Sequence, residues 1–77
     1  MVILIDMKKV MDVFADRLQE QRKYNNISII ELANAIGVSD NAIRRWEKKL
    51  RIPNIETLVL IANYFGVTPN YLVGFED

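Results

Sequence analysis

The 77-residue sequence contains no cysteine and no histidine. Without cysteine the chain forms no disulfide and offers no thiolate to a metal ion. Without histidine it lacks the commonest zinc ligand, the usual general base and the group that activates a serine nucleophile. Its three glycines are isolated, so no glycine-rich loop is available to cradle a phosphate. These absences argue against an enzyme, a metal site, a cofactor or a small-molecule ligand.

The sequence also lacks a long apolar run. Residues 2–5 are Val-Ile-Leu-Ile, far short of the ~20 residues that a membrane-spanning helix needs. The basic start and the small-residue cleavage site of a signal peptide are missing too, so we expect a cytoplasmic protein without a membrane partner. We interpret residues 1–6 as an apolar N-terminal extension. Three alternatives are open for this extension: it pairs as an edge strand with a second chain, it docks on the first helix, or it is disordered.

What the sequence does contain is helical periodicity, interrupted by residues that cap and end helices. Together these signals predict five helices, at about 7–24, 29–36, 40–49, 55–65 and 69–74. Ser28-Ile-Ile-Glu31 has the spacing of a capping box, and Ser39 and Thr68 stand at later helix starts. No stretch alternates with a period of two for long enough to form a strand. We therefore predict an all-α fold, a compact five-helix bundle that forms one domain over residues 7–77.

One sequence pattern occurs twice, at an offset of 29 residues. Residues 32–43 (LANAIGVSDNAI) and 61–72 (IANYFGVTPNYL) each read as helix, glycine stop, hydroxyl cap and second helix. Any short helix-turn-helix needs such caps, which is a sufficient explanation of the likeness. The two units differ in charge, although the whole chain has a formal net charge of zero. Residues 39–51 hold five basic and two acidic residues (net +3), whereas residues 52–77 hold no basic and three acidic residues (net −3). Only the first unit is electrostatically suited to DNA.

The second helix of a DNA-binding helix-turn-helix lies in the major groove, where its first residues meet base edges. We predict that the base-reading residues here are Asp40, Asn41, Arg44 and Arg45, which share one outer face. Asn can bond adenine, Arg can bond guanine, and Asp can accept from cytosine. The alternative for Asp40 is that it stabilises the positive N-terminus of its own helix. The residues predicted to contact the DNA backbone are Ser28, Ser39, Lys48, Lys49 and Arg51.

Residues 14–75 resemble the lambda-repressor/Cro-like (Xre) family of helix-turn-helix regulators. The matching residues include Phe14, Arg17-Leu18, Arg22, Glu31-Leu32-Ala33, Ile36-Gly37-Val38-Ser39, Trp46-Glu47, Ile52-Pro53, Glu56-Thr57-Leu58 and Phe65-Gly66-Val67. The resemblance implies a five-helix domain with its helix-turn-helix at about 29–49. It also implies a transcriptional regulator of the repressor type, from a bacterium, phage or mobile element, that binds operator DNA as a dimer.

The resemblance further implies an ion pair between Arg22 and Glu47. If exposed, such a pair would contribute about 0–1 kcal/mol and would act mainly in orientation. Three departures from the family pattern leave the operator sequence open. Ile29 stands where the family usually has a phosphate-binding Gln, and Asp40 brings a negative charge to a reading position. Lys49 stands where Gly is usual, which costs about 1 kcal/mol if its φ is positive.

A module this small makes few base contacts, so we expect a homodimer on a pseudo-palindromic double-stranded operator with half-sites about 34 Å apart. Apolar residues beyond those needed for a core predict its interface: Val59, Tyr64, Tyr71, Val73 and Phe75. The competing explanation is that the fifth helix packs on the first and buries these residues within the monomer. The alternative function is a protein-interaction module on the same scaffold, antitoxin-like or anti-repressor-binding, which Ile29-Ile30 and the apolar C-terminal helices suggest.

Overall fold

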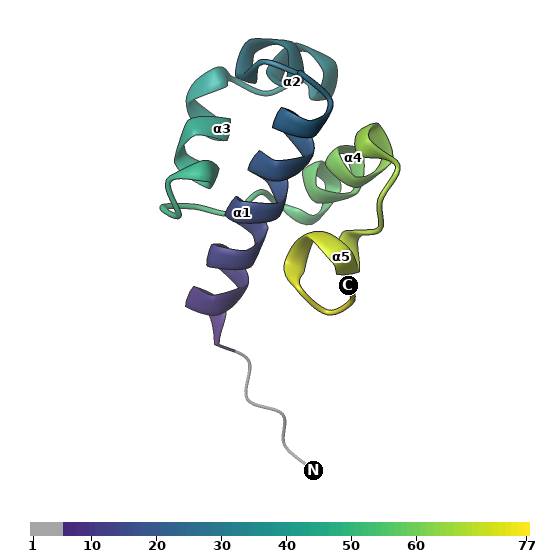
Figure 1. Cartoon of the computed structure of the whole chain (residues 1–77). Coiled ribbons are helices and arrows are strands. Elements are labelled where there is room, and N and C mark those ends of the chain that lie inside the picture. Colours follow the sequence, from purple (N-terminus) through teal and green to yellow (C-terminus); the bar gives the residue numbers. More distant parts are fainter. Residues whose placement is uncertain (1–5) are drawn as a thin grey trace.

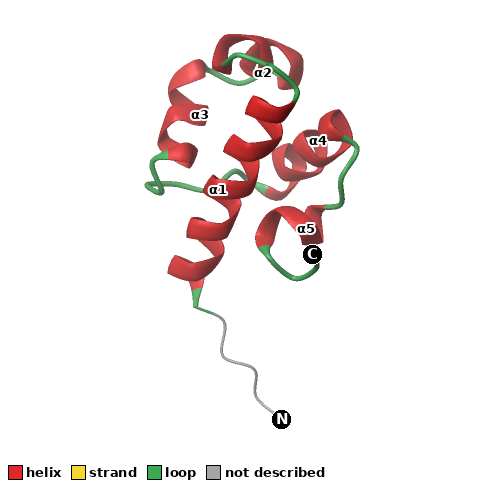
Figure 2. Ribbon diagram, viewed as in Figure 1, coloured by secondary structure: helices red, strands yellow, loops and turns green. Residues whose placement is uncertain are grey.

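The computed structural model describes residues 6–77, and within them helices are connected only by turns and loops (Figure 2). The helices are α1 (Met7–Tyr24), α2 (Ile29–Ile36), α3 (Asp40–Glu47), α4 (Ile55–Phe65) and α5 (Pro69–Val73). The predicted all-α fold of five helices is confirmed. The interpretations of the segment 2–5 concern residues outside the described part of the chain.

The residue that precedes each helix caps it: its side chain accepts a hydrogen bond from a backbone amide of the first turn. The predicted capping box is present at α2: Ser28 Oγ accepts from the Glu31 amide at 3.0 Å, and Glu31 Oε1 accepts from the Ser28 amide at 3.5 Å. Ser39 and Thr68 cap α3 and α5 as predicted. Caps of this kind are each worth about 1 kcal/mol, so local sequence alone stabilises these helix starts.

Two predicted helix ends are wrong by one or two residues. The third helix stops at Glu47 rather than at 49, because Lys49 adopts the left-handed conformation with φ 65°. The fifth helix stops at Val73 rather than at 74, because Gly74 has φ 90°. A residue in this conformation turns the chain out of the helix. Glycine signals such an end in the sequence, whereas lysine does not.

The core is assembled around α1. Figure 1 shows α3 on one side of α1 and the α4–α5 pair on the other, and both α3 and α5 contact α1. The largest fully buried side chains come from all five helices: Phe14, Leu18, Leu32, Ile43, Ile61 and Leu72. Phe14 also meets Trp46 edge to face, with ring centroids 6.3 Å apart, which fixes α3 against α1. Met7, in the first turn of α1, lies outside this core and is exposed.

Candidate nucleic-acid interface

The helix-turn-helix consists of α2, the turn 37–39 and α3, and the two helices pack against each other. Gly37 ends α2 with φ 74°, and Ser39 Oγ then accepts from the Ala42 amide at 3.1 Å. Between them Val38 packs against the core. The turn is therefore held at three successive residues, and it fixes the direction in which α3 leaves it.

The faces of α3 are clearly divided between core and solvent. Ile43 and Trp46 are buried, whereas Asn41, Arg44 and Arg45 are exposed. The structure thus places these predicted base-reading residues together on the outer side of one short helix. Among residues 6–77, no group of three or more histidine, cysteine, aspartate or glutamate residues is arranged to hold a metal ion.

Two of the predicted base-reading residues are paired with each other. Arg44 Nε lies 3.6 Å from Asp40 Oδ2, one helical turn away, and both side chains are 48% exposed. Arg45 forms no ion pair with any residue between 6 and 77. The two arginines of α3 therefore differ in how freely their guanidinium groups can move.

The residues predicted to contact the DNA backbone fall into two groups. Ser28 and Ser39 lie at the N-termini of α2 and α3, and their hydroxyl oxygens accept from backbone amides. A hydroxyl that accepts in this way keeps its own proton for a phosphate oxygen. Lys48 and Arg51 are exposed beyond α3. All four can reach an anion without breaking a bond that the fold needs.

Lys49 differs from the other predicted backbone contacts, because its ammonium group is directed to α1. Its Nζ atom lies 3.5 Å from Asp16 Oδ1, and both side chains are largely exposed. Asp16 was not among the residues predicted for this surface. A signal was present, because Asp12, Asp16 and Glu20 recur every four residues and so form an acidic stripe along one side of α1.

The two isoleucines at the start of α2 have different environments. Ile29 is partly buried and packs against the core, whereas Ile30 is exposed. The departure from the family pattern at Ile29 therefore has a structural reason. Any anion at this helix start would meet the backbone amides and the Ser28 hydroxyl, but no side-chain amide.

Arg22 of α1 and Glu47 of α3 form a two-pronged ion pair. Arg22 Nε donates to Glu47 Oε2 at 2.8 Å, and Nη2 donates to Oε1 at 2.9 Å. Arg22 Nη1 also donates to the Ile27 carbonyl at 3.2 Å, and Gln19 Nε2 donates to Glu47 Oε1 at 3.3 Å. The pKa of the Arg22 guanidinium is raised, mainly by the hydrogen bond to Glu47 and also by its charge, against the opposing effect of burial.

The side chains of Arg22 and Glu47 are only 14% and 6% exposed. The small contribution expected for an exposed pair is therefore the wrong estimate for this one, because little water competes for either group. Bidentate hydrogen bonds between charged groups are also stronger than single neutral ones. The pair ties the end of α1, the following loop and the end of α3 into one unit, and so holds α3 in a fixed orientation.

At the other side of α1, the structure follows the competing explanation for two of the predicted interface residues. The Arg17 guanidinium carbon lies 4.4 Å from the centre of the Tyr71 ring, and Arg17 donates to the Tyr71 carbonyl. Arg17 Nη1 also donates to the Glu76 carbonyl at 2.6 Å. These bonds hold the C-terminal residues on α1. This role of Arg17 was not predicted from the sequence, because its partners are carbonyl groups more than 50 residues away.

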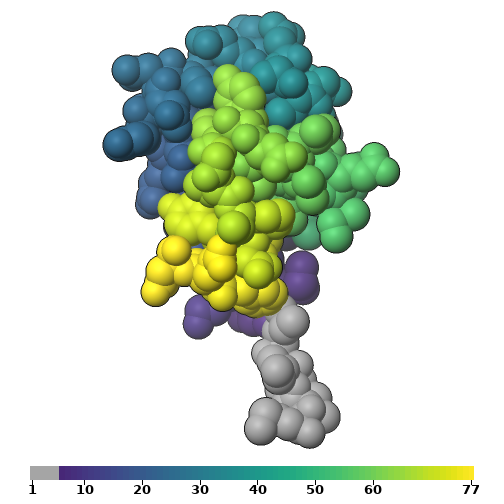
Figure 3. Space-filling view, turned by 90° about the vertical axis from the view of Figure 1, so that its right-hand side faces the viewer, coloured from purple at the N-terminus to yellow at the C-terminus, as the bar shows by residue number. Residues whose placement is uncertain are grey.

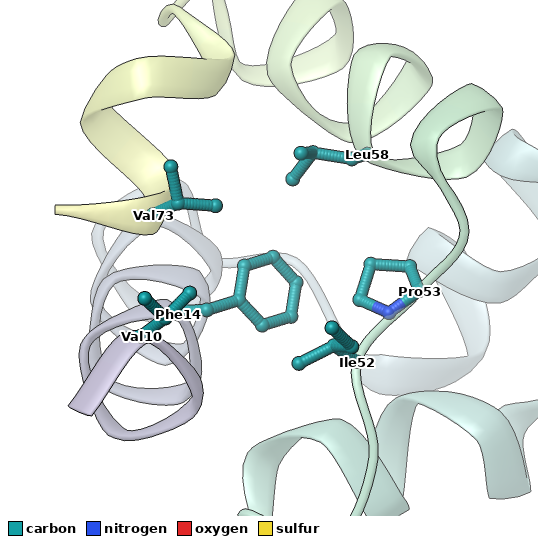
Figure 4. A pocket seen from close by; sticks show the side chains of 6 residues that line it. All are labelled: Val10, Phe14, Ile52, Pro53, Leu58 and Val73. Atoms are coloured by element: carbon teal, nitrogen blue, oxygen red, sulfur yellow. The ribbon is translucent and has the colours of Figure 1, made fainter. Parts of the chain in front are cut away.

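Val73 is likewise occupied within the monomer. It lines an apolar pocket of about 40 Å³ between α1, α4 and the loop before α4, into which Figure 4 shows the side chains converging. The pocket is lined by Val10, Phe14, Ile52, Pro53, Leu58 and Val73. It has almost no polar lining and is too small to hold more than a single small group. We therefore interpret it as a packing defect at the edge of the core and not as a ligand site.

The remaining predicted interface residues, Val59, Tyr64 and Phe75, are exposed. They belong to α4 and to the C-terminal residues that form the face seen in Figure 3. Val59 and Tyr64 lie about 140° apart around α4, since each residue advances the helix by about 100°. They therefore belong to two different sides of α4. Each has an exposed apolar neighbour one turn away, Ile55 for Val59 and Leu60 for Tyr64.

A capped helix-turn-helix with a basic outer face, fixed to the first helix by a largely buried ion pair, defines a small domain of the DNA-binding type. Comparison with protein families shows which one. The model of the Helix-turn-helix family matches residues 18–72, and the chain belongs to that family. The predicted resemblance to lambda-repressor-like regulators is thereby confirmed.

Relatives of the chain are transcriptional regulators. The HTH-type transcriptional activator BcrR of Enterococcus faecalis is 36% identical over 64 residues, which cover 83% of this chain and 31% of that protein. The CTXphi transcriptional repressor RstR of Vibrio cholerae is 31% identical, over 84% of this chain and 59% of that protein. The chain spans between 28% and 59% of the length of the six curated relatives compared.

Two solved structures share the fold. The c2 repressor of phage P22, solved in complex with a synthetic operator, superposes with a TM-score of 0.78 at 30% identity, over 83% of this chain and 97% of that chain. A hypothetical transcription factor from Neisseria, NHTF, also has a TM-score of 0.78, over 95% of this chain and 84% of that chain. Because its identity is 22%, it supports the fold alone. No helix within residues 6–77 has the length and hydrophobicity required to cross a bilayer.

Proposed function

We propose that this chain is the sequence-specific DNA-binding domain of a transcriptional regulator of the repressor type, and that α3 reads the major groove. One observation carries the proposal. The exposed face of α3 presents Asn41, Arg44 and Arg45, and its opposite face is fixed in the core. Both helices of the unit also start at exposed hydroxyl caps, Ser28 and Ser39. The 30% identical P22 repressor, solved with a synthetic operator, supports the same assignment. A protein that binds operator DNA in a bacterium works in the cytoplasm.

The proposed roles follow from the chemistry of each side chain. Asn41 suits adenine and the arginines suit guanine, because each can form two parallel hydrogen bonds to these bases. Ser28, Ser39, Lys48 and Arg51 suit phosphates, which fix the register and give affinity that depends on salt. Lys49 contributes less, because its ammonium group is already close to Asp16.

The experiment that tests this function is selection of bound duplexes from a random DNA library, repeated at two salt concentrations. We expect one enriched sequence motif and an affinity that falls as salt rises. A library that emerges without enrichment, with binding insensitive to salt, would refute the proposal. The enriched motif would also give the half-site spacing directly.

We further propose that the chain binds its operator as a homodimer. We leave Tyr71 and Val73 out of the proposed interface, because both are partly buried within the monomer. Of the exposed residues Val59, Tyr64 and Phe75, we choose Val59, because Ile55, 76% exposed, lies one turn earlier on the same side of α4. Leu50 and Ile52, in the segment that leads from α3 to α4, are exposed as well. An apolar surface this close to α3 would set the distance between two reading helices.

Sedimentation at several concentrations tests the dimer. Val59→Arg should shift the chain toward monomer, whereas Tyr64→Arg, on the other side of α4, is the matched control. The opposite ranking would place the interface on the Leu60 and Tyr64 side. A wild-type chain that stays monomeric with and without operator DNA would refute the homodimer.

A second candidate function, a protein-interaction module, is favoured by one observation. Ile30 is exposed in the first turn of α2, at the end of the molecule that would otherwise approach a phosphate. A partner protein that covers this residue would compete with DNA. Stable binding of a partner that is lost in Ile30→Ser, by a chain that selects no DNA sequence, would favour this function over the first.

A further inference from the structure

The ion pair between Asp40 and Arg44 has a feature that bears on recognition. Asp40 Oδ2 approaches Arg44 through Nε, the nitrogen at the base of the guanidinium group, at 3.6 Å. The contact that Arg44 makes within residues 6–77 is through Nε, and its two terminal nitrogens form no hydrogen bond in this part of the chain. These terminal nitrogens are the pair that can meet guanine O6 and N7 end on. The carboxylate therefore occupies the side of the guanidinium that a guanine does not need.

We propose that Asp40 is a positioning residue, which holds the Arg44 guanidinium end on for a guanine and does not itself read a base. The inference rests on the proposed DNA-binding function and adds a specificity mechanism to it. Asp40 and Arg44 would then act together and recognise a single G·C base pair in each half-site.

The physical reason is preorganisation. A free arginine side chain has many rotamers, and ordering them on binding lowers the affinity for any target. An ion pair that forms before the DNA arrives removes part of this loss. Arg45 has no such partner among the described residues, so it must be ordered entirely by the DNA.

The same carboxylate also acts against the wrong contact. A phosphate brought to Arg44 would lie close to Asp40, where like charges repel, whereas the edge of guanine carries no net charge. Asp40 therefore lowers non-specific affinity while it supports the specific contact. Only Oδ2 of Asp40 faces Arg44. A bond from Oδ1 to cytosine N4 is the competing role of this carboxylate, and it would appear as a base preference that does not depend on Arg44.

The test is a double-mutant cycle read out by selection from random duplexes. It compares the wild type with Asp40→Ala, Arg44→Ala and the double variant. Arg44→Ala should abolish the preference for guanine at one base pair. Asp40→Ala should weaken the preference at that same base pair about two- to fivefold, the scale of one exposed ion pair. The base preferences of the double variant should match those of Arg44→Ala, because without the arginine the carboxylate has nothing to position.

Glu20→Ala is the matched control, because it removes one exposed negative charge from α1 and leaves α3 intact. It should raise affinity slightly for all duplexes without changing any base preference. Circular dichroism melting shows that each variant is folded, and Asp40→Asn should behave like Asp40→Ala because it also lacks the charge.

Two results would overturn the inference alone. Asp40→Ala could relax a different base pair from Arg44→Ala, with additive effects, in which case Asp40 reads a base itself. It could also leave every base preference unchanged, in which case its role is confined to the helix N-terminus. A wild-type chain that enriches no motif is a different result, which overturns the proposed function and this inference together.

Discussion

Arg22 and Glu47, 25 residues apart in sequence, meet through two hydrogen bonds of 2.8 and 2.9 Å that join the end of α1 to the end of α3. Because α3 carries the residues proposed to read bases, this pair connects the stability of the fold to the geometry of recognition. A rotation of α3 about its axis would have to break both bonds.

Glu47→Ala should lower the free energy of unfolding by about 3 kcal/mol, because it leaves the largely buried Arg22 charge without its partner. Urea denaturation measures the change. Arg44→Ala, which breaks an exposed pair, is the control and should cost less than about 1 kcal/mol. Equal losses in the two variants would show that Arg22 is satisfied without Glu47.

The contribution of Arg22 should not depend on pH over the neutral range. Its pKa is raised on folding, so the stability it adds is fully present below its unfolded pKa. That stability is lost only as pH rises through the folded value, far above neutrality. The loss of stability in Arg22→Met, measured by urea at pH 7 and pH 9, should therefore be the same. A loss that shrinks at pH 9 would mean that Arg22 deprotonates there.

Lys49→Gly should stabilise the domain by about 0.5–1 kcal/mol. The left-handed backbone at this residue, with φ 65°, costs a lysine about 1 kcal/mol relative to glycine. The exposed pair with Asp16 offsets only a fraction of this gain. Lys49→Ala is the matched control: it loses the pair and keeps the strain, so it should be neutral or slightly destabilising. Thermal melting that ranks alanine above glycine would contradict the assignment.

Asn41→Ala and Lys48→Ala should weaken DNA binding in different ways. The asparagine lies on the reading face of α3, so its loss should relax the preference at one base pair and cost about 1–3 kcal/mol on the selected duplex. The lysine lies beyond α3 and faces solvent, so its loss should weaken all duplexes alike and reduce the salt slope by about 1. Titration of a selected and a scrambled duplex at several salt concentrations separates the two effects. A uniform loss in Asn41→Ala would remove it from base reading.

Gly74→Ala should destabilise the domain more than Gly66→Ala. Both glycines have a positive φ, which costs alanine about 1 kcal/mol. A Cβ at position 74 would also lie 3.0 Å from a methyl carbon of Val13, whereas one at position 66 meets nothing within 4 Å. The difference between the two variants, measured by urea denaturation, isolates how tightly the end of α5 is pressed onto α1. Adding Val13→Ala should remove most of that difference, and its persistence would refute the contact.

Local features of the fold were predictable from sequence. The caps at Ser28, Ser39 and Thr68 and the glycine stop at Gly37 each follow from residues within one turn of the helix. The end of α3 was not predictable from lysine itself, which has no preference for a left-handed backbone. Only the family resemblance, in which glycine is usual at position 49, pointed to the positive φ found there.

Contacts between distant segments were harder to predict. The outer face of α3 follows from its period of 3.6 residues, so the reading residues could be grouped from sequence. Whether Tyr71 is free for a second chain depends on how α5 docks on α1, and its stacking under Arg17 involves residues 54 positions apart. The pairing of Lys49 with Asp16 was hard to predict for the same reason, because no rule of spacing connects these two residues.

The bonds from Arg17 to the carbonyls of Tyr71 and Glu76 have a practical consequence for experiments on this domain. They hold the C-terminal residues on the side of α1 that faces α5, and Figure 1 shows α3 on the opposite side. A fluorophore, an affinity tag or a fused reporter attached after Asp77 would therefore point away from the proposed DNA surface. The same attachment point would let a dye report on the release of the C-terminal residues from α1 while α3 stays available to bind.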